Sequence, residues 1–544
     1  MNNKYIIWLA LILVISLLAR VATLNSEWID VDEGNYLYDA KLLSEGAMPF
    51  QDFYMKEFLY TFVLSSYGKI FGLSLMGIRF LSAIFSLVTI IFMYKIGSRL
   101  YDNKTGIAAA ALYAFMPFAI FWNNLVRESV LGIMLMTIAV YYLIKFIKTE
   151  NFLDIGMNAL FLFLAFITRR SMIFFLLAEA LLLIYMHRNR IRFLIKSFAY
   201  AVLGASLPFL LLLAYSYAID ANFLKMLGFE FSPITNAFSW QQFLGQRILL
   251  PYWLLREAAY AIVPLMIVIL FTLKDRLRWF LFGFFSILVL TSAFAFEYAV
   301  LKFPERMSQY PVPSAWFYIA SLAYLAAFFA VSYKILKSGH IFEETNKTAL
   351  LWLVSIMAFY AIYSRFHVVY FAEAIPATII LITPFLTRLY NEKNLLSKLF
   401  FMLFAIGMVL SAYFYIEYHG LNNKWSIETA NDAAAYVKEN TNAGDEIFTP
   451  LTFIAIMSER ELVLNITHPL YYHFDGAGDI DIAGTPSFKT IMNYMDKNNI
   501  KYVIADDYMD VTYYSMKPDL KNYIEQNYAL EKQIDGISVL ARKR

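Results

Sequence analysis

Three carboxylates stand within four residues, at Asp30, Asp32 and Glu33, soon after the first long apolar run of the chain. A carboxylate could act there as the general base that takes a proton from an attacking hydroxyl. Helix capping is the alternative, because Asp30 with Glu33 three positions later is the residue pair of a capping box. Capping leaves Asp32 without a structural role, so Asp32 is the first candidate for chemistry.

A short helix is predicted to position these acids. Residues 34–45 carry apolar side chains on one face and charged ones elsewhere, and Gly46 and Pro49 then end the helix. We therefore predict an amphipathic helix at the outer membrane surface, entered through residues 30–33. Asp52 would belong to the turn after Pro49.

The composition indicates a membrane protein. Of the 544 residues, 60% are hydrophobic and 16% are charged, and repeated apolar runs of about 20 residues are typical of membrane-spanning helices. The net charge of +3 is too small to indicate a nucleic-acid partner. The chain has no cysteine, which excludes disulfides and cysteine-based metal sites.

Thirteen apolar runs are predicted to span the membrane. They are 5–24, 79–98, 105–122, 129–147, 152–168, 171–186, 193–216, 257–273, 279–296, 314–334, 349–363, 368–387 and 398–416. The first lacks a clear small-x-small cleavage site, so it is interpreted as an uncleaved span. The segment Phe58–Leu75 is interrupted by Lys69 and is predicted to lie in or dip into the outer interface.

The basic residues predict the orientation and the domains. With a cytoplasmic N-terminus every predicted inside loop is basic, as the positive-inside rule requires, and the C-terminus lies outside the plasma membrane. Residues 1–418 would form a polytopic α-helical domain, and 419–544 a soluble extracytoplasmic α/β domain. Within it we predict helices at 426–440 and 487–498, strands at 446–449, 462–466 and 502–505, and a solvated tail at 541–544.

The segment from Asp32 to Leu59 resembles the first external loop of the GT-C glycosyltransferases. This group includes protein O-mannosyltransferases and lipid A aminoarabinose transferases, which share an Asp-Glu pair, a Tyr-Ala-like helix, a Gly-x-x-Pro-Tyr/Phe turn, an Asp, and Lys-Pro-Pro-Leu. This sequence supplies Asp32-Glu33, Tyr36, Gly46, Pro49-Phe50, Asp52 and Lys56 in the same order and spacing. It departs from the family at Lys56-Glu57-Phe58-Leu59, where both prolines are missing.

The resemblance implies a sugar donor linked to polyprenyl phosphate, either dolichyl or undecaprenyl, and transfer to an acceptor hydroxyl, usually with inversion. Asp32 would match the catalytic aspartate as general base, and Glu33 would orient it or the acceptor. The leaving group is a lipid phosphate, so cations must stabilise its growing charge. Lys56 is the first candidate for that role.

Two adjacent arginines are further candidates. Residues 163–171 resemble the family's Gly-Leu-Ala-x-Leu-Thr-Lys-Gly segment, with Arg169 or Arg170 in place of the lysine. An arginine at mid-membrane costs about 2.5–3.5 kcal/mol on insertion scales, so two together need an interface or an anion. A tight outside turn is the alternative, but the positive-inside rule disfavours arginines on that side, which favours phosphate binding.

Two other segments add further candidates. Residues 364–376 are similar to a family segment that begins a late span, which implies that Arg365, His367 and Tyr370 face the outer cavity. Arg365 is preferred, because a lone histidine is more often structural. Glu128 would match a second acidic residue that relatives place in the second external loop, and a cap on the next span formed with its neighbour Arg127 is an equal alternative.

A metal ion is left open. Some GT-C enzymes hold a divalent cation through carboxylates and others use none. The residue before Lys56 is Met55, not an acid, which removes one ligand. No metal ligand is therefore assigned, and a divalent cation stays an open alternative to a cofactor-free site.

The sequence as a whole predicts an integral membrane glycosyltransferase with an outward-facing cavity. Its partners would be the polyprenyl-phosphate donor, membrane lipids and an acceptor on a protein, lipid or glycan, with no nucleic acid. A secondary transporter is one rival, but it should show paired halves with broken helices, and the sequence shows no such repeat. A non-catalytic membrane scaffold is the other.

Overall fold

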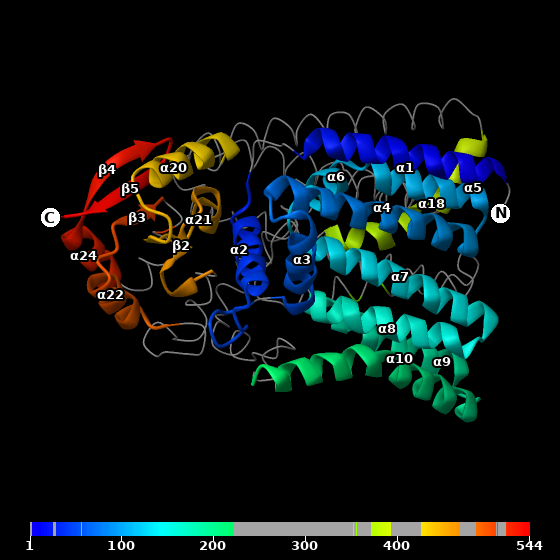
Figure 1. Ribbon diagram of the computed structural model, residues 1–544. Coiled ribbons are helices and arrows are strands. Elements are labelled where there is room, and N and C mark those ends of the chain that lie inside the picture. Colours follow the sequence, from blue (N-terminus) through cyan, green and yellow to red (C-terminus); the bar gives the residue numbers. More distant parts are fainter. Residues whose placement is uncertain are drawn as a thin grey trace, which may run out of the picture.

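The computed structural model describes residues 3–24, 29–55, 57–220, 352, 355, 372–392, 426–467, 486–506, 509 and 518–543. Within these ranges an elongated molecule has a helical bundle at one end and an α/β domain at the other (Figure 1). Apart from residues 352 and 355, the predicted spans between 257 and 363 lie outside the described residues, as does the span at 398–416.

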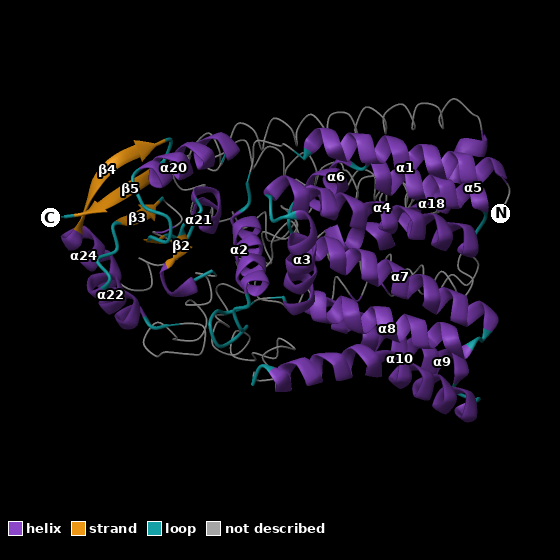
Figure 2. Ribbon diagram, in the orientation of Figure 1, coloured by secondary structure: helices purple, strands orange, loops and turns teal. Residues whose placement is uncertain are grey.

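The bundle consists of long apolar helices that run side by side along the molecule (Figure 2). Five described helices are long and apolar enough to cross a membrane, so the chain is an integral membrane protein. The described bundle helices are α1 (Asn3–Thr23), α4 (Leu75–Leu100), α5 (Asn103–Phe115), α6 (Pro117–Asn124), α7 (Glu128–Thr149), α8 (Phe152–Thr168), α9 (Ile173–His187), α10 (Ile191–Ala218) and α18 (Ile375–Glu392).

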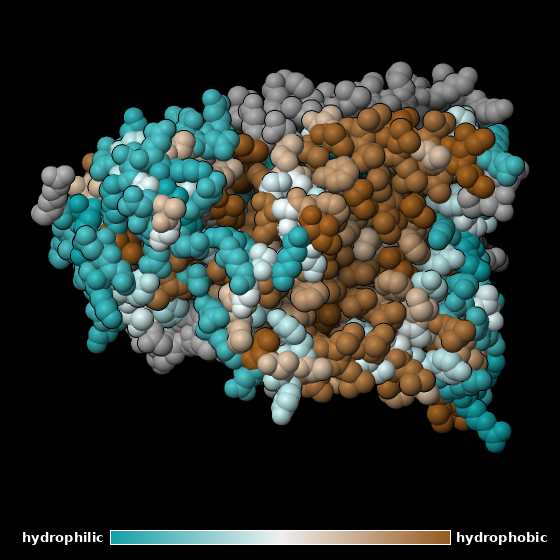
Figure 3. All heavy atoms as spheres, in the orientation of Figure 1, coloured by the Kyte–Doolittle hydropathy of each residue, from teal (hydrophilic) through white to brown (hydrophobic). Residues whose placement is uncertain are grey.

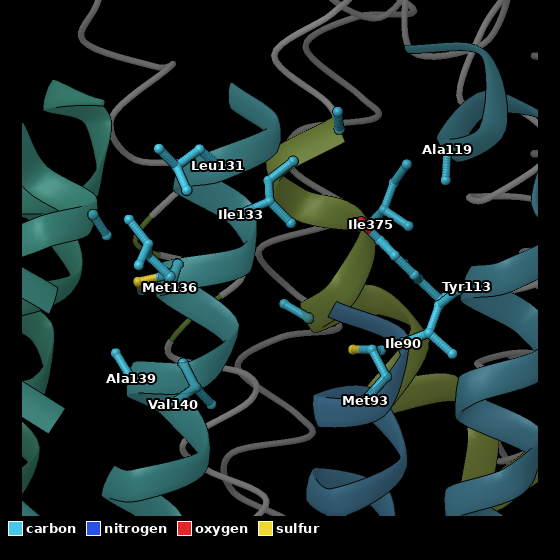
Figure 4. Packing of buried hydrophobic residues seen from close by; sticks show 14 of the residues in the cluster. Ile90, Met93, Tyr113, Ala119, Leu131, Ile133, Met136, Ala139, Val140 and Ile375 are labelled. Carbon is cyan, nitrogen blue, oxygen red and sulfur yellow. The ribbon is translucent and has the colours of Figure 1, made fainter. Parts of the chain in front are cut away.

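The bundle has a buried apolar core, and its outer surface is apolar as well. Ile90, Met93, Tyr113, Leu131 and Met136 pack between helices from distant parts of the chain (Figure 4). The outer faces of α1 and α10 also carry large apolar side chains that are exposed. Hydrophobic atoms accordingly cover the helical part, while hydrophilic ones gather on the α/β domain and on the opposite end of the bundle (Figure 3). This is the surface expected of helices that face lipid.

The predicted span at 105–122 is broken in the structure. It forms α5 and α6, which meet at Met116 because Pro117 has no N–H to continue the helix and starts a new one. The buried guanidinium of Arg20 on α1 donates to the carbonyl oxygen of Ala114 over 3.0 Å, beside the break. An arginine inside a predicted span thus supports the irregular backbone.

Two shorter helices, α2 (Val31–Glu45) and α3 (Phe58–Phe71), lie between the bundle and the α/β domain (Figure 1). The predicted amphipathic character of α2 is wrong, because its side chains are buried on both faces and even Asp39 is inaccessible. α3 has 14 residues, which agrees with the prediction that this segment does not cross the membrane.

The α/β domain is a five-stranded sheet in the order β2-β1-β3-β5-β4, with helices on both faces. Its first three strands are parallel, and β5 pairs antiparallel with β3 and β4. α20 and α21 pack on one face, and α22 and α24 on the other. The elements are α20 (Ile427–Glu439), β1 (Glu446–Phe448), α21 (Thr452–Ser458), β2 (Glu461–Leu462), α22 (Phe488–Lys497), β3 (Tyr502–Ala505), α24 (Pro518–Asn527), β4 (Tyr528–Ile534) and β5 (Ile537–Arg542).

This domain confirms the predicted α/β class but corrects two details. The predicted tail at 541–544 is wrong, since β5 extends to Arg542, whose guanidinium binds Asp496 at 2.6 Å. The predicted strand at 462–466 is only the two-residue β2, followed by a 3-10 turn. The predicted domain boundary at 418/419 lies outside the described residues.

Candidate active site

The three neighbouring acids Asp30, Asp32 and Glu33 lie at the start of α2. Asp30 is its N-cap: its carboxylate accepts from the amide of Asp32 at 2.9 Å. The carboxylate of Glu33 accepts in turn from the amide of Asp30 at 3.0 Å, which completes a capping box. The capping alternative for Asp30 and Glu33 is therefore confirmed, and Asp32 is not needed for it.

Glu33 also forms a buried ion pair with the bundle. Its two carboxylate oxygens accept from Nε and Nη2 of Arg79 at 2.8 and 2.6 Å, and the amide of Val126 adds a third bond at 2.9 Å. Both charged side chains are almost fully inaccessible, at 1% and 0% exposure. A carboxylate so enclosed fixes α2 to α4, and its predicted role in orienting Asp32 or the acceptor stays a prediction.

Arg127 links the first acid to the second. Its Nε donates to Asp30 at 2.9 Å, its Nη1 lies 3.5 Å from Oδ2 of Asp32, and its guanidinium lies over the ring of Trp122. Burial alone would lower the pKa of Arg127, but the carboxylates around it raise that pKa above its ordinary value. The cation is therefore permanent.

Asp32 is the most accessible acid of the group. Its side chain is 25% exposed, against 8% for Asp30 and 0% for Glu33. It is thus accessible from solvent, as a base that must reach the acceptor proton needs to be, and a fixed cation lies at one side. Its role as base stays a prediction.

A second charged cluster lies where α7, α8 and α18 begin or end. Glu128, in the first turn of α7, forms an ion pair with Arg169, the C-cap of α8. Nε of Arg169 also donates to Glu373 at 2.6 Å, and the hydroxyl of Ser171 donates to the other oxygen of Glu373 at 2.7 Å. The arginine is thus held between two buried carboxylates.

Tyr36 connects the two clusters. This fully buried residue of α2 packs edge-on against Tyr60 of α3, with ring centroids 5.0 Å apart. Burial raises the pKa of Tyr36 well above its ordinary value, and the charge of neighbouring Glu128 raises it further. The phenol therefore stays protonated beside the carboxylate of the second cluster.

The structure brings together some predicted site residues and leaves others undescribed. Asp32, Glu33, Glu128 and Arg169 belong to the two linked clusters, and Arg170 is half-buried at the start of the short turn that joins α8 to α9. The predicted phosphate ligands Lys56, Arg365 and Tyr370 lie outside the described residues, as does His367. Their roles stay predictions.

Arg79 and Glu373 had no predicted role, and Arg127 was predicted only as a partner of Glu128 in a cap on the next span. A signal existed for Arg79, because a charged residue at the start of an apolar span needs a partner or an interface. Glu373 lies in the segment that resembles a family motif, but the motif itself marks no acid there. Only the folded chain places this glutamate beside Arg169, over 200 positions earlier.

A metal site is not apparent in the described part of the chain, where no three His, Asp or Glu side chains come together as ligands. The acids of the first cluster instead meet Arg79 and Arg127. The alternative of a divalent cation stays open, because several of the predicted site residues are not described.

Comparison with known proteins begins with the sequence. The sequence model of the family described as dolichyl-phosphate-mannose-protein mannosyltransferase matches residues 56–215, which extend from the end of the loop after α2 into α10. A search of curated proteins finds no match.

Solved structures show the fold more completely. The chain is similar to ArnT from Cupriavidus metallidurans bound to undecaprenyl phosphate, with 12% identity, coverage of 98% of both chains and a TM-score of 0.58. It is also similar to the archaeal oligosaccharyltransferase AglB from Archaeoglobus fulgidus in complex with an inhibitory peptide and a dolichol-phosphate. There the identity is 14%, the coverage is 100% of this chain and 75% of that chain, and the TM-score is 0.51.

These findings confirm the predicted fold. The chain has the GT-C fold, a polytopic helical membrane domain followed by an α/β domain. The matched family and AglB are glycosyltransferases by description. At such low identity the structures support the fold and assign no role to an individual residue.

Proposed function

We propose that this protein is a membrane glycosyltransferase that moves a sugar from a polyprenyl-phosphate donor to an acceptor hydroxyl, with Asp32 as general base. The observation that carries the proposal is the position and exposure of Asp32. It is the one acid of its cluster that is neither part of the capping box nor fully buried, and it lies in the first turn of α2 beside the cation of Arg127.

The chemistry needs two kinds of group, and both have candidates. The acceptor oxygen attacks the anomeric carbon, the bond from that carbon to the phosphate oxygen breaks, and Asp32 takes the acceptor proton. The lipid phosphate leaves with its negative charge, which cations must stabilise. We assign that role to Lys56, Arg170 and Arg365, with the hydroxyl of Tyr370 as a further hydrogen-bond donor to the phosphate.

Arg169 enters this scheme differently from its neighbour. Its charge is already balanced by Glu128 and Glu373, so direct contact with a phosphate would require one carboxylate to give way. We therefore propose that Arg169 and Glu128 shape the donor side of the cavity and that Arg170 is the arginine that meets the phosphate.

The donor lipid and the orientation follow from the same proposal. A long isoprenoid phosphate is favoured because ArnT and AglB are described with undecaprenyl phosphate and dolichol-phosphate. The acceptor would lie on the outer face of the plasma membrane and belong to a protein, a lipid or a glycan. Mass spectrometry of glycans and glycolipids from cells with and without the gene would identify the sugar and the acceptor.

Replacing Asp32 by Asn tests the assigned base. We expect kcat for sugar transfer by the purified protein to fall by about 10²–10⁴, because the acceptor proton loses its base. Donor binding and the unfolding temperature should stay close to the original values. D52N is a matched control, since Asp52 accepts from the amide of Met48 in an exposed turn.

Each other outcome is informative. Transfer that continues unchanged in D32N would overturn the assignment of Asp32. A wild-type protein that binds polyprenyl-phosphate sugars but never transfers them would favour the scaffold alternative, and movement of an intact donor across the membrane would favour a transporter.

A further inference from the structure

The helix that carries Asp32 is also part of the core of the α/β domain. Val31, Tyr38 and Leu42 of α2 pack in one apolar cluster with the inner faces of α20, α21 and the sheet. Tyr36, Leu37 and Ala40 of the same helix pack in the core of the membrane bundle. α2 is therefore shared between two cores, and its position depends on both.

Glu461 on β2 receives two bonds from α2. One oxygen accepts from the hydroxyl of Tyr38 at 2.8 Å and the other from Nζ of Lys41 at 2.6 Å. These donors are three positions apart, so they lie one above the other on the same helix face. The amide of Leu462 also donates to the hydroxyl of Tyr38 at 2.7 Å, so two hydrogen bonds hold this tyrosine at β2, the edge strand of the sheet.

A second contact lies one turn closer to Asp32. The hydroxyl of Thr452 on α21 donates to Oδ1 of Asn35 at 2.8 Å. Beside it, Gly34 lets the two helices approach so closely that an added Cβ would lie 2.4 Å from the amide nitrogen of Phe453. The domain thus contacts α2 along its length, on both sides of Asp32.

Glu461 is charged, as an acceptor of two hydrogen bonds from α2 should be. Partial burial would raise its pKa, but the bonds from Lys41 and Tyr38 lower that pKa below its ordinary value. The carboxylate is therefore ionised at neutral pH and keeps both bonds.

We propose that Glu461 is a positioning residue of the active site, which fixes the rotation and height of α2 through Tyr38 and Lys41 and thereby places Asp32. The inference rests on the proposed function of Asp32 as base. In this arrangement the α/β domain is a structural part of the catalytic centre and not only a surface for the acceptor. Displacement of a catalytic group by about 1 Å can cost about a hundredfold in rate.

The test uses the full-length protein with three substitutions. Glu461→Ala removes both acceptors, Glu461→Gln keeps one oxygen and most of the shape, and Tyr38→Phe removes only the hydroxyl. We expect kcat to fall about ten- to a hundredfold in E461A, less in Y38F, and to recover most of the way in E461Q. The dissociation constant of the donor and the unfolding temperature should change little.

Glu459 provides a matched control two positions away. It pairs with Lys438 at an exposed place in the same domain, so E459A should leave kcat unchanged. If E461A and Y38F transfer sugar at the original rate, or if they raise only the KM of the acceptor, the proposal is overturned and the domain serves the acceptor instead.

Hydrogen exchange separates failure of this proposal from failure of the proposed function. In E461A the amides of α2 should exchange faster, while those of α7 should not change, whatever reaction the protein catalyses. A wild-type protein without transferase activity would overturn the proposed function alone. Unchanged exchange in α2 would overturn the positioning role alone.

Discussion

At the scale of single residues, the pairing of Arg127 with the two acids at the start of α2 decides how the base behaves. A cation within a few ångströms of a carboxylate favours its ionised form. Arg127 lies 3.5 Å from Asp32 and is bonded to Asp30, so its removal changes both groups.

Replacing Arg127 by Met is expected to lower kcat for sugar transfer, because it removes the cation beside Asp32 and leaves the buried carboxylate of Asp30 without its ion-pair partner. The measurement is kcat for sugar transfer by the purified protein at neutral pH. R127K keeps the charge and should keep more of the rate; an R127M rate that equals that of the wild type would show that Arg127 does not act on the base.

The buried Glu33–Arg79 pair should matter for the stability of the fold. Arg79→Met leaves a buried carboxylate without its cation, which is expected to cost about 3–5 kcal/mol of unfolding free energy. Thermal unfolding of the purified protein in detergent measures the loss. The double variant E33Q/R79M should recover much of it, because neither remaining group is charged.

An exposed ion pair supplies the contrast. Arg190 and Glu150 are 50% and 43% exposed, so R190M should lower the free energy of unfolding far less than R79M does. If R79M proved as mild as R190M, the buried pair would not be what fixes α2 to α4.

The same residues show what a sequence can predict about a site. The capping role of Asp30 follows from its spacing to Glu33, because caps form between neighbours in the chain. The partner of Glu33 lies 46 positions away and that of Arg169 over 200, and spacing carries no information about such contacts. The sequence thus points to the acids at the start of α2, while their ion pairs with Arg79 and Arg127 emerge only from the fold, as does the contact of Glu373 with Arg169.

At the scale of elements, the close approach of α2 and α21 at Gly34 is a specific weak point. Gly34 allows α2 to lie against α21, and an added Cβ would meet Oγ1 of Thr452 at 2.6 Å and the backbone of Phe453 at 2.4 Å. Alanine in place of glycine inside a helix normally adds up to about 1 kcal/mol of stability. Here the backbone contact leaves no room for the methyl group.

We therefore expect Gly34→Ala to separate α21 from α2 and to lower the unfolding temperature and the rate of sugar transfer. Limited proteolysis should cleave the α/β domain faster in G34A than in the wild type. Gly68→Ala on α3 is the matched control, because the nearest atoms belong to the side chain of Leu73, which can rotate away. Equal proteolysis of G34A and wild type would contradict the close packing.

The sequence predicts an element well when neighbouring residues alone determine its pattern. The bundle helices follow from the length of their apolar runs. The burial of both faces of α2 does not follow from its sequence, because the α/β domain that covers the second face lies far away in the chain. The hairpin of β4 and β5 did leave a local trace: Asp535-Gly536 between two strand-like runs is a two-residue turn signal, and both residues have positive φ in the structure. The strands predicted from the sequence do not include this hairpin.

At the scale of the whole molecule, the predicted inside loops that join described helices gather at one end. The loops after α4, α7 and α9 lie at the end opposite the α/β domain (Figure 1). They also contact one another, since Nη1 of Arg190 binds Glu150 at 2.5 Å and Nζ of Lys148 donates to the carbonyl of Arg99. The basic loops therefore share one side, as the positive-inside rule requires of cytoplasmic loops.

The absence of cysteine from the sequence allows the absolute orientation to be measured directly. Each introduced cysteine is then the only thiol of the chain, so labelling by a membrane-impermeant maleimide reports one position. We choose Asn522 on α24 and Asn189 between α9 and α10, because both are exposed and lie on opposite sides in the predicted topology. In intact cells N522C should react at once, while N189C should react only after the membrane is opened. The reverse pattern would invert the chain and move the proposed acceptor to the cytoplasmic face, because Asp32 and the α/β domain share α2 and cannot lie on different sides.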